Sequence, residues 1–426
     1  MIEAVVLAAG KGVRLEPITH TRPKVLVPIL NETLISRHLR QLKDLGIRRV
    51  IIVVRYMKEE VIEYVNRLNE DLGLDIEFVD QGKELGTGHA VLQALPYLKS
   101  NEVLVVYGDL YLDPLILPET LKAKGNTLLA VKGKDPSKYG LLVTDKDLMV
   151  KDIIEKPPLE VVKRYEPLIN GGVYKLSKDI LKLSEHIEVS PRGEYEFTDV
   201  IKLAVSKGHR IKALLINEGL WSDVGYLWNV LDVNKRELMR LKGRVIRGDI
   251  EPNVTIKGPV VIEEGTYVRS GTYIEGPVYI GRGCSVGPNT YLRPYSVILE
   301  GSKVGASVEV KASLIMEHVH ASHLSYIGDS IVCEHANLGA GTITANLRFD
   351  ERDVKVFVKG VRISSGRKKL GAFIGGHVKT GINVSIYPGV KIGAYSWIYP
   401  GVRVKKDVPP WTVVKSEDTY EPLKPY

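Results

Sequence analysis

The stretch Leu7-Ala8-Ala9-Gly10-Lys11-Gly12-Val13-Arg14 ends an apolar run that begins at Ala4, and Arg22-Pro23-Lys24 follows it. The run Ala4–Ala9 predicts a buried β-strand, and the two glycines predict a tight turn at its carboxyl end. Glycines let backbone N–H groups approach a ligand, and Arg14 and Lys24 add positive charge, a combination that favours a phosphate chain. The turn is too short for G-x-G-x-x-G and lacks the G-K-[ST] of a P-loop, which disfavours a dinucleotide site or an ordinary NTPase.

Up to about residue 220, short aliphatic runs alternate with helical patterns. The expected strands are Ala4–Ala9, Val50–Val54, Ile76–Asp80, Val103–Tyr107, Leu128–Val131, Leu141–Thr144 and Ile211–Ile216. Amphipathic stretches such as Leu34–Leu45 and Glu59–Leu68 predict helices between them. This alternation predicts an α/β fold with a doubly wound, mostly parallel sheet. Ligands of such sheets bind outside the carboxyl ends of the strands, where the glycine turn lies.

After a helical connector the period changes to six residues. Aliphatic residues fall at Ile250, Ile256, Ile262, Val268, Ile274, Ile280, Val286, Leu292, Ile298, Val304 and Val310, and again at Ile374, Ile386, Ile392, Ile398 and Val404. A six-residue period with interleaved turn residues predicts a parallel β-helix, in which three hexads form one coil. The repeat breaks between about Asn346 and Leu370. We therefore expect an N-terminal domain at 1–226, a connector at 227–244, a β-helix at 245–408 and a capping or docking tail at 409–426.

The composition is that of an ordinary globular protein, with 26% charged and 44% hydrophobic residues. No apolar run approaches the length of a membrane span, which predicts no membrane association. Two cysteines, Cys284 and Cys333, form no disulfide framework and favour a reducing compartment, most simply the cytoplasm. The net charge of +8 comes without a basic run, so phosphorylated small substrates explain it better than nucleic acid does.

The pattern L-A-A-G-x-G-x-R-L-x-P-x-T…R-P-K, continuing to Pro28, resembles the signature of sugar-1-phosphate nucleotidylyltransferases. The resemblance implies nucleotide binding by Gly10 and Gly12 and catalysis by Arg14 and Lys24. Val13 stands where that family usually has threonine or serine, which implies one phosphate contact fewer. The implied reaction is attack by a sugar-1-phosphate oxygen on the α-phosphorus of a nucleoside triphosphate, with release of pyrophosphate.

Two aspartates end motifs that resemble the metal site of this family. Tyr107-Gly108-Asp109 matches its G-D motif, and Trp221-Ser222-Asp223-Val224-Gly225 matches its W-x-D-x-G motif. The resemblance implies that Asp109 and Asp223 hold Mg²⁺ or Mn²⁺ together with substrate phosphates and water. Taken alone, each aspartate fits a strand-end cap or a turn residue equally well.

Further segments of the N-terminal half resemble the base and sugar subsites. The run Gln81–Ala90 resembles the segment that reads the base, which implies nucleotide-binding roles for Gln81, Gly86 and Thr87. Three more segments, around Gly140, Glu155-Lys156 and Asn170, resemble the sugar-phosphate side. The resemblance implies that Lys156 meets the phosphate while Gly140, Glu155 and Asn170 bind hydroxyl groups. Without it, Glu155-Lys156 is an exposed ion pair.

Polar residues interrupt the hexads from about residue 293 to 346. This series resembles the acetyltransferase half of bifunctional glucosamine-1-phosphate acetyltransferase / N-acetylglucosamine-1-phosphate uridyltransferase, and the whole chain is most similar to the archaeal branch. The implied general base is His323. The implied amino-sugar phosphate residues are Arg293, Lys311, Tyr326, Asn337, Asn346 and Arg352, and Ala340 and Gly376 are expected beside acetyl-CoA. Leu347, Arg352 and Gly376 stand where bacterial relatives carry tyrosine, lysine and serine, which leaves the range of amino sugars open.

The group His318, His320 and His323 also has an H-x-H-x-x-H spacing that suits a metal. No cysteine or carboxylate cluster completes such a site, so a zinc centre is disfavoured. From the residues alone, His320 and His323 are equal candidates for the base.

The sequence therefore predicts a cytoplasmic bifunctional transferase of nucleotide-sugar synthesis, assembled as a homotrimer through its β-helix. Its expected substrates are acetyl-CoA, glucosamine-1-phosphate or galactosamine-1-phosphate, and UTP or dTTP, and its product is UDP-N-acetylglucosamine or a related nucleotide sugar. One alternative is a monofunctional thymidylyl- or guanylyltransferase whose β-helix only assembles and regulates. A second is a non-catalytic binding subunit, which would not need the phosphate and metal residues.

Overall fold

The computed structural model describes residues 2–133 and 136–423, which form two compact units. Unit 1 consists of Met1–Lys11, Pro23–Leu26 and Leu34–Asp223. Unit 2 consists of Gly12–Arg22, Val27–Thr33 and Val224–Tyr426. Two short segments from near the N-terminus thus belong with the C-terminal half. The domain boundaries at 226, 244 and 408 stay predictions.

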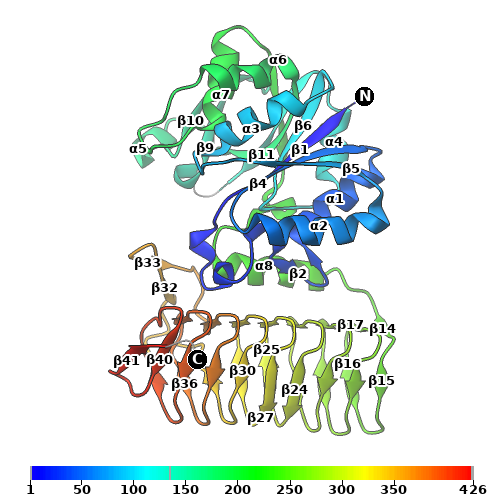
Figure 1. Cartoon of the computed structure of the whole chain (residues 1–426), viewed down its shortest axis with the longest axis vertical. Coiled ribbons are helices and arrows are strands. Elements are labelled where there is room, and N and C mark those ends of the chain that lie inside the picture. Colours follow the sequence, from blue (N-terminus) through cyan, green and yellow to red (C-terminus); the bar gives the residue numbers. More distant parts are fainter. Residues whose placement is uncertain (1, 134–135, 424–426) are drawn as a thin grey trace. The chain divides into compact units, whose positions relative to one another are not determined.

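Unit 1 is built on a nine-stranded sheet (Figure 1). Its parallel part runs in the order β6 (Glu102–Tyr107), β1 (Glu3–Ala8), β4 (Arg49–Val54) and β5 (Asp75–Asp80). The remaining strands are β8 (Asn126–Lys132), β9 (Gly140–Thr144), β10 (Val150–Glu155), β11 (Leu168–Ser177) and β12 (Ile211–Ile216). The α/β fold is confirmed. The sheet is mixed, because β11 runs antiparallel to β6, β8 and β9.

Side-chain alternation along β1 explains why helices cover both faces of the sheet. Val5 and Leu7 belong to the apolar cluster that contains residues of α3 (Thr87–Ala94) and α7 (Phe197–Ser206). Val6 belongs to the opposite cluster, with residues of α1 (Leu34–Asp44) and α2 (Lys58–Leu72). Successive side chains of a strand point to opposite faces, so a continuous apolar run needs cover on both.

Unit 2 contains a left-handed parallel β-helix whose three faces are parallel sheets (Figure 1). The first sheet consists of β14 (Arg244–Ile246), β17 (Val260–Ile262), β20 (Val278–Ile280), β23 (Ser296–Ile298), β26 (Leu314–Ile315), β29 (Ile331–Val332), β34 (Phe373–Ile374) and β37 (Lys391–Ile392). The second consists of β15 (Asp249–Ile250), β18 (Tyr267–Val268), β21 (Ser285–Val286), β24 (Lys303–Ala306), β27 (His320–His323), β30 (Asn337–Leu338), β35 (Lys379–Thr380), β38 (Trp397–Ile398), β40 (Thr412–Val414) and β41 (Tyr420–Pro422). The third consists of β16 (Thr255–Lys257), β19 (Tyr273–Glu275), β22 (Tyr291–Leu292), β25 (Glu309–Lys311), β28 (Tyr326–Gly328), β31 (Ile343–Thr344), β36 (Ser385–Ile386) and β39 (Arg403–Val404).

The aliphatic residue of each hexad points into the core of the β-helix. The early coils contain eighteen residues, as shown by the pairing of Val260 with Val278. The coils that begin at Val297 and Leu314 contain seventeen, since Val297 pairs with Leu314 and Leu314 with Ile331. Each of these coils thus has one hexad shortened by a residue. This shortening is why the aliphatic pattern fades from the sequence after Val310.

The break in the repeat is an inserted hairpin. Its strands are β32 (Lys355–Val358) and β33 (Val361–Ser364), and the Leu370 N–H donates to the Asn346 carbonyl at 2.9 Å across its base. Near the C-terminus, β40 continues the second sheet and β41 pairs with it antiparallel. An antiparallel last strand covers an edge that would otherwise be open to another chain.

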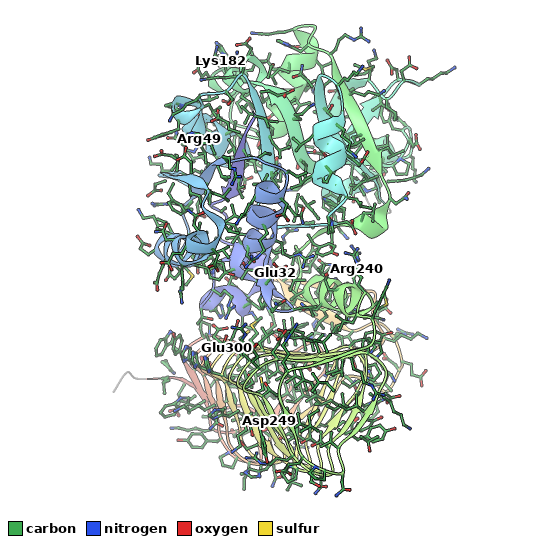
Figure 2. All side chains as sticks on the ribbon, turned by 90° about the vertical axis from the view of Figure 1, so that its right-hand side faces the viewer. Glu32, Arg49, Lys182, Arg240, Asp249 and Glu300 are labelled. Carbon is green, nitrogen blue, oxygen red and sulfur yellow. The ribbon has the colours of Figure 1, made fainter. Side chains whose placement is uncertain are left out.

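Four further elements position residues of the candidate sites. They are β2 (Pro28–Ile29), β7 (Leu110–Leu112), β13 (Trp221–Asp223) and α8 (Leu227–Leu238). Charged side chains such as Lys182 and Asp249 are exposed, and both can be located in Figure 2. No helix in the described ranges is both long and apolar enough to span a bilayer.

Candidate functional site

Three residues expected at the nucleotidyl site lie together in unit 1. The Nζ of Lys24 donates to Oδ2 of Asp109 at 2.5 Å and lies 3.7 Å from Oδ1 of Asp223. The aspartates meet because Asp109 precedes β7, and β7 pairs with β13, which ends at Asp223. The Lys24 side chain is only 8% exposed, so solvent screens these charges poorly.

The glycine turn after β1 leaves open space. The Gly108 N–H donates to the Leu7 carbonyl at 2.9 Å, so the ends of β6 and β1 are in direct contact. A Cβ on Gly10 would meet no atom within 4 Å, which means that packing in unit 1 does not require glycine there. Close approach of a ligand would require it.

Gly12 and Arg14 belong to unit 2. Gly12 has a φ of 68°, in the left-handed region that favours glycine. The Arg14 guanidinium lies 5.2 Å from the centre of the Tyr226 ring, which stacks on Trp228 at 4.6 Å.

The residues expected to read the base contact other residues of unit 1. Gln81 is 4% exposed, and its Nε2 donates to the Gly86 carbonyl at 2.9 Å. Gly86 has a φ of 95°, and a Cβ there would come within 2.6 Å of the Tyr195 carbonyl. The Thr87 hydroxyl accepts from the Phe197 N–H at 3.1 Å. These three residues therefore have structural partners, and their contact with a base stays a prediction.

The sugar-side residues come from three adjacent strands. Gly140 on β9 pairs with Glu155 on β10, and a Cβ on Gly140 would lie 3.2 Å from the Glu155 carboxylate. Asn170 on β11 donates to the Tyr174 hydroxyl at 2.5 Å, and burial raises the pKa of that hydroxyl. Lys156 is exposed at a φ of 45°. The sheet thus brings Gly140, Glu155 and Asn170 together at one end of neighbouring strands.

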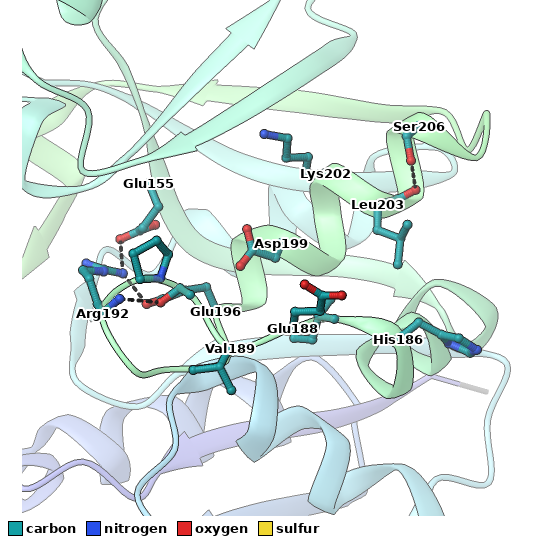
Figure 3. Close-up of a pocket in the computed structure, with 13 residues that line it drawn as sticks. Glu155, His186, Glu188, Val189, Arg192, Glu196, Asp199, Lys202, Leu203 and Ser206 are labelled. Carbon is teal, nitrogen blue, oxygen red and sulfur yellow. Dashed lines mark hydrogen bonds and ion pairs between the residues drawn. The ribbon is translucent and has the colours of Figure 1, made fainter.

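A pocket of about 620 Å³ borders this group (Figure 3). Arg192 pairs with Glu196 and lies 3.4 Å from Glu155, and the Thr198 hydroxyl donates to Glu155 at 3.2 Å. Burial raises the pKa of Glu196, and the charge of Arg192 opposes that rise. The sequence does not predict roles for Arg192, Glu196 and Thr198. Opposite charges four residues apart were the one local signal for the first two.

Four of the six expected amino-sugar residues lie on strands of the third sheet or just after them: Arg293, Lys311, Tyr326 and Asn346. Lys311 donates to Oδ2 of Asp329 at 2.7 Å. Asn346 donates to the same oxygen at 2.6 Å and to the Tyr326 hydroxyl at 3.1 Å. Burial is the main cause of a raised pKa at Tyr326. Asp329, which was not expected from the sequence, therefore joins three expected residues into one network.

A pocket of about 600 Å³ in unit 2 contains part of this network. Its lining includes six cationic residues, Lys235, Arg293, Lys311, Arg367, Lys368 and Lys369, and two anionic ones, Asp232 and Asp329. Arg293 pairs with Glu309 at 2.9 Å, and its buried Nε has no hydrogen-bond partner among the described residues. Arg367 pairs with Asp232 of α8 at 2.5 Å. The excess of positive charge favours an anionic ligand.

The pocket residues of α8 and of the insertion were also missed from the sequence. Arg367, Lys368 and Lys369 follow the hairpin, and Lys235 lies in the helical connector. The run of three cations was a local signal, but no periodicity places it beside Lys311. Arg352, by contrast, is exposed in the loop before β32 and does not line the pocket.

His323 is exposed at the end of β27, where the second sheet passes to the third. The Gly341 N–H donates to the His323 carbonyl at 3.4 Å, which places Ala340 in the next coil at the same edge. Asn337 pairs with His320 rather than with His323. The structure therefore brings His323 and Ala340 together and leaves Asn337 at the opposite end of the strand.

Gly376 lies at a different edge, between β34 and β35. A Cβ there would come within 2.8 Å of the Thr21 hydroxyl and 2.9 Å of Glu334. His318 belongs to the same edge, where its ring stacks on His335 at 5.1 Å. The H-x-H-x-x-H residues are thus distributed from one edge of the second sheet to the other.

Comparisons with known proteins cover both halves of the chain. The nucleotidyl transferase family model matches residues 3–239, and the GMPPB C-terminal domain model matches residues 274–368. A bifunctional sugar-1-phosphate nucleotidylyltransferase/acetyltransferase of Sulfurisphaera tokodaii is 50% identical over 96% of this chain and 98% of its own. The bifunctional protein GlmU of Methanocaldococcus jannaschii is 42% identical over 98% of both chains. The protein of that name from Thermodesulfovibrio yellowstonii is 28% identical over 96% of this chain and 95% of its own.

Proposed function

The chain belongs to the nucleotidyl transferase family as a bifunctional sugar-1-phosphate nucleotidylyltransferase/acetyltransferase, and we propose that it makes UDP-N-acetylglucosamine or a related nucleotide sugar. The β-helix acetylates the amine of glucosamine-1-phosphate or galactosamine-1-phosphate with acetyl-CoA. The doubly wound domain, residues 1–226, then transfers UMP or dTMP from UTP or dTTP to the sugar phosphate. The connector is 227–244, the β-helix 245–408 and the tail 409–426, whose last three residues lie outside the described range.

Nucleotidyl transfer needs positioning and charge neutralisation more than a base. An oxygen of the sugar phosphate attacks the α-phosphorus, the bond to the β-phosphate breaks, and pyrophosphate leaves with its electron pair. Arg14 and Lys24 neutralise the charge that develops on the leaving group, while Gly10 and Gly12 present backbone N–H groups to the phosphates. Gln81, Gly86 and Thr87 hold the nucleotide.

Asp109 and Asp223 suit a divalent cation, because their oxygens converge on one Lys24 Nζ and Mg²⁺ prefers oxygen ligands. No group of three or more His, Cys, Asp or Glu suited to a metal occurs in the described ranges. Mg²⁺ or Mn²⁺ would therefore take the rest of its ligands from substrate phosphates and water. When bound, the ion supplies positive charge beside the triphosphate.

Four residues orient the sugar at the nucleotidyl site. Glu155, Asn170 and the Gly140 N–H bind hydroxyl groups, and Lys156 meets the phosphate. The register that pairs Gly140 with Glu155 supports this role, because two hydroxyl-binding groups then face one substrate.

Acetyl transfer takes place beside His323. The neutral amine attacks the thioester carbon, His323 accepts the amine proton, and the carbon–sulfur bond breaks. The same proton then passes to the leaving thiolate, so that coenzyme A is released as a free thiol and His323 is neutral again. Arg293, Lys311, Tyr326 and Asn346 bind the amino-sugar phosphate in this proposal, and Ala340 contacts acetyl-CoA. Asn337, Arg352 and Gly376 lie apart from these groups within one chain, and their roles in the same site stay predictions from the resemblance. The buried Nε of Arg293 supports an oxyanion in the pocket, since a buried donor without an acceptor is costly.

We also propose that three copies assemble through the β-helix in the cytoplasm. Leu324 beside His323 is 65% exposed, and Leu347 and Phe349 after Asn346 are exposed as well. Exposed apolar side chains at both ends of the strands of the third sheet support a subunit interface on the β-helix. Buried, unpaired Cys284 and Cys333 support a reducing compartment. Sedimentation analysis of the purified protein tests the trimer.

The observation that carries the proposal is the meeting of Lys24, Asp109 and Asp223 in space, 85 residues apart along the chain for the first two. One coupled assay tests it. Purified protein is incubated with acetyl-CoA, glucosamine-1-phosphate, UTP and Mg²⁺, and thiol and pyrophosphate are measured separately. Release of both supports the bifunctional enzyme, whereas pyrophosphate without thiol would indicate a nucleotidylyltransferase whose β-helix only assembles and regulates.

A further inference from the structure

We infer that Arg22 is a positioning residue for nucleotidyl transfer, and that Glu317 and Glu334 of the β-helix fix the loop Gly12–Arg22 through it. Nucleotidyl transfer would then depend on side chains of the acetyltransferase β-helix. This role rests on the proposed functions of Arg14 and Lys24.

Arg22 contacts Glu317 and Glu334, which belong to unit 2 as it does. Its Nη1 and Nη2 donate to the two carboxylate oxygens of Glu317 at 3.2 and 2.6 Å. The same Nη2 lies 3.4 Å from Glu334. A planar guanidinium held by two oxygens of one carboxylate has a defined orientation as well as a defined position.

Neighbouring residues of the loop add to this attachment. The Thr21 hydroxyl donates to Glu334 at 2.5 Å, and the Ala394 N–H donates to Nδ1 of His20 at 3.3 Å. Gly376 faces Thr21 so closely that a Cβ would come within 2.8 Å of its hydroxyl. Three consecutive loop residues thus contact four successive coils along one edge of the β-helix.

The network is shielded from solvent. The Arg22 side chain is 16% exposed, that of Glu334 10% and that of Glu317 28%. Burial raises the pKa of Glu317, but the charge and hydrogen bonds of Arg22 outweigh burial and hold it below its usual value. Removing one partner from such a network leaves an uncompensated charge. Detaching the loop from the β-helix therefore has a high cost in free energy.

Two residues expected at the nucleotidyl site depend on the position of this loop. Lys24 follows Arg22 by two residues, and Arg14 lies within the loop itself. Inside the loop, the Thr19 hydroxyl donates to the Gly12 carbonyl at 3.0 Å, which ties the start of the loop to its second half. Two residues span at most about 7 Å, so fixing Arg22 restricts where Lys24 can lie. Small displacements of groups that position a substrate lower the reaction rate strongly.

The test uses the full chain with Glu317→Gln and Arg22→Gln. We expect each to lower kcat/KM for pyrophosphate release by about tenfold or more, with thiol release from acetyl-CoA unchanged. The matched control is Glu263→Gln, which breaks a similar ion pair of the β-helix, with Arg247 at 2.7 Å, and should change neither activity. Exchange of the charges, Arg22→Glu with Glu317→Arg, should restore part of the lost activity.

Two results would overturn the inference. One is wild-type nucleotidyl transfer in Glu317→Gln. The other is a parallel loss of both activities, which would indicate a general loss of stability rather than a misplaced loop. Absence of pyrophosphate release by the wild-type protein is a different outcome, because it would contradict the proposed function itself.

Discussion

The Nζ of Lys24 and Oδ2 of Asp109 lie 2.5 Å apart at the carboxyl end of the parallel strands. The same ammonium lies 3.7 Å from Asp223, so one positive charge is shared by two carboxylates. Two carboxylates thus converge on one ammonium, and carboxylate oxygens are the ligands that Mg²⁺ prefers. Such a site attracts a cation, and the following prediction depends on it.

Asp109→Asn should abolish pyrophosphate release, because a neutral amide binds a divalent ion more weakly than a carboxylate and no longer balances the charge of Lys24. Thiol release from acetyl-CoA should continue, since the expected acetyl site lies in unit 2. Excess EDTA should have the same two effects on the wild-type enzyme. Undiminished nucleotidyl transfer in EDTA would contradict the metal assignment.

His323→Ala should lower acetyl transfer by roughly 10²–10⁴-fold, the usual contribution of a positioned general base. His320→Ala should matter much less, because His320 pairs with Asn337 at the far end of the strand. Both rates are measured as thiol release, with pyrophosphate release as the unaffected control. A crippling His320→Ala beside a mild His323→Ala would reverse the assignment of the base.

Lys369→Gln should raise KM for the amino-sugar phosphate by about tenfold, since the side chain lines the cationic pocket and each charge-assisted bond contributes about 1.5–3 kcal/mol. KM for acetyl-CoA should stay constant. Lys257→Gln, an exposed lysine of the first coils, serves as the control. An unchanged KM for the amino-sugar phosphate in Lys369→Gln would show that the insertion does not bind this substrate.

Acid should weaken the attachment of the loop through Glu317. The pKa of this carboxyl is held below 4.5 by Arg22 in the folded protein and returns to its ordinary value on unfolding. The stabilisation is therefore complete above about pH 4.5 and decreases as the pH falls through the folded-state pKa. Thermal unfolding measured between pH 6 and 3, at about one-unit steps, should show less acid sensitivity in Glu317→Gln than in the wild type. Identical pH profiles would contradict this linkage.

The sequence by itself determined the two architectures and most of the chemistry. Strand-and-helix alternation and the six-residue period are local patterns, so the burial of Val6 on one face of β1 and of Ile274 in the β-helix core was readable from spacing alone. The glycine turn and the motif residues were equally local. The antiparallel direction of β11 could not be predicted from local spacing, because strand direction depends on which strands it pairs with.

The tertiary structure alone decided which of these residues meet. Contacts such as Asp329 with Asn346, Arg367 with Asp232, and Arg22 with Glu317 join side chains from different elements. The coil of seventeen residues also shifts the hexad register beside the pocket, which no fixed period anticipates. Local spacing specifies which face of an element is apolar. The positions of charged groups across 295 residues of intervening chain, as between Arg22 and Glu317, are set only when the whole core has packed.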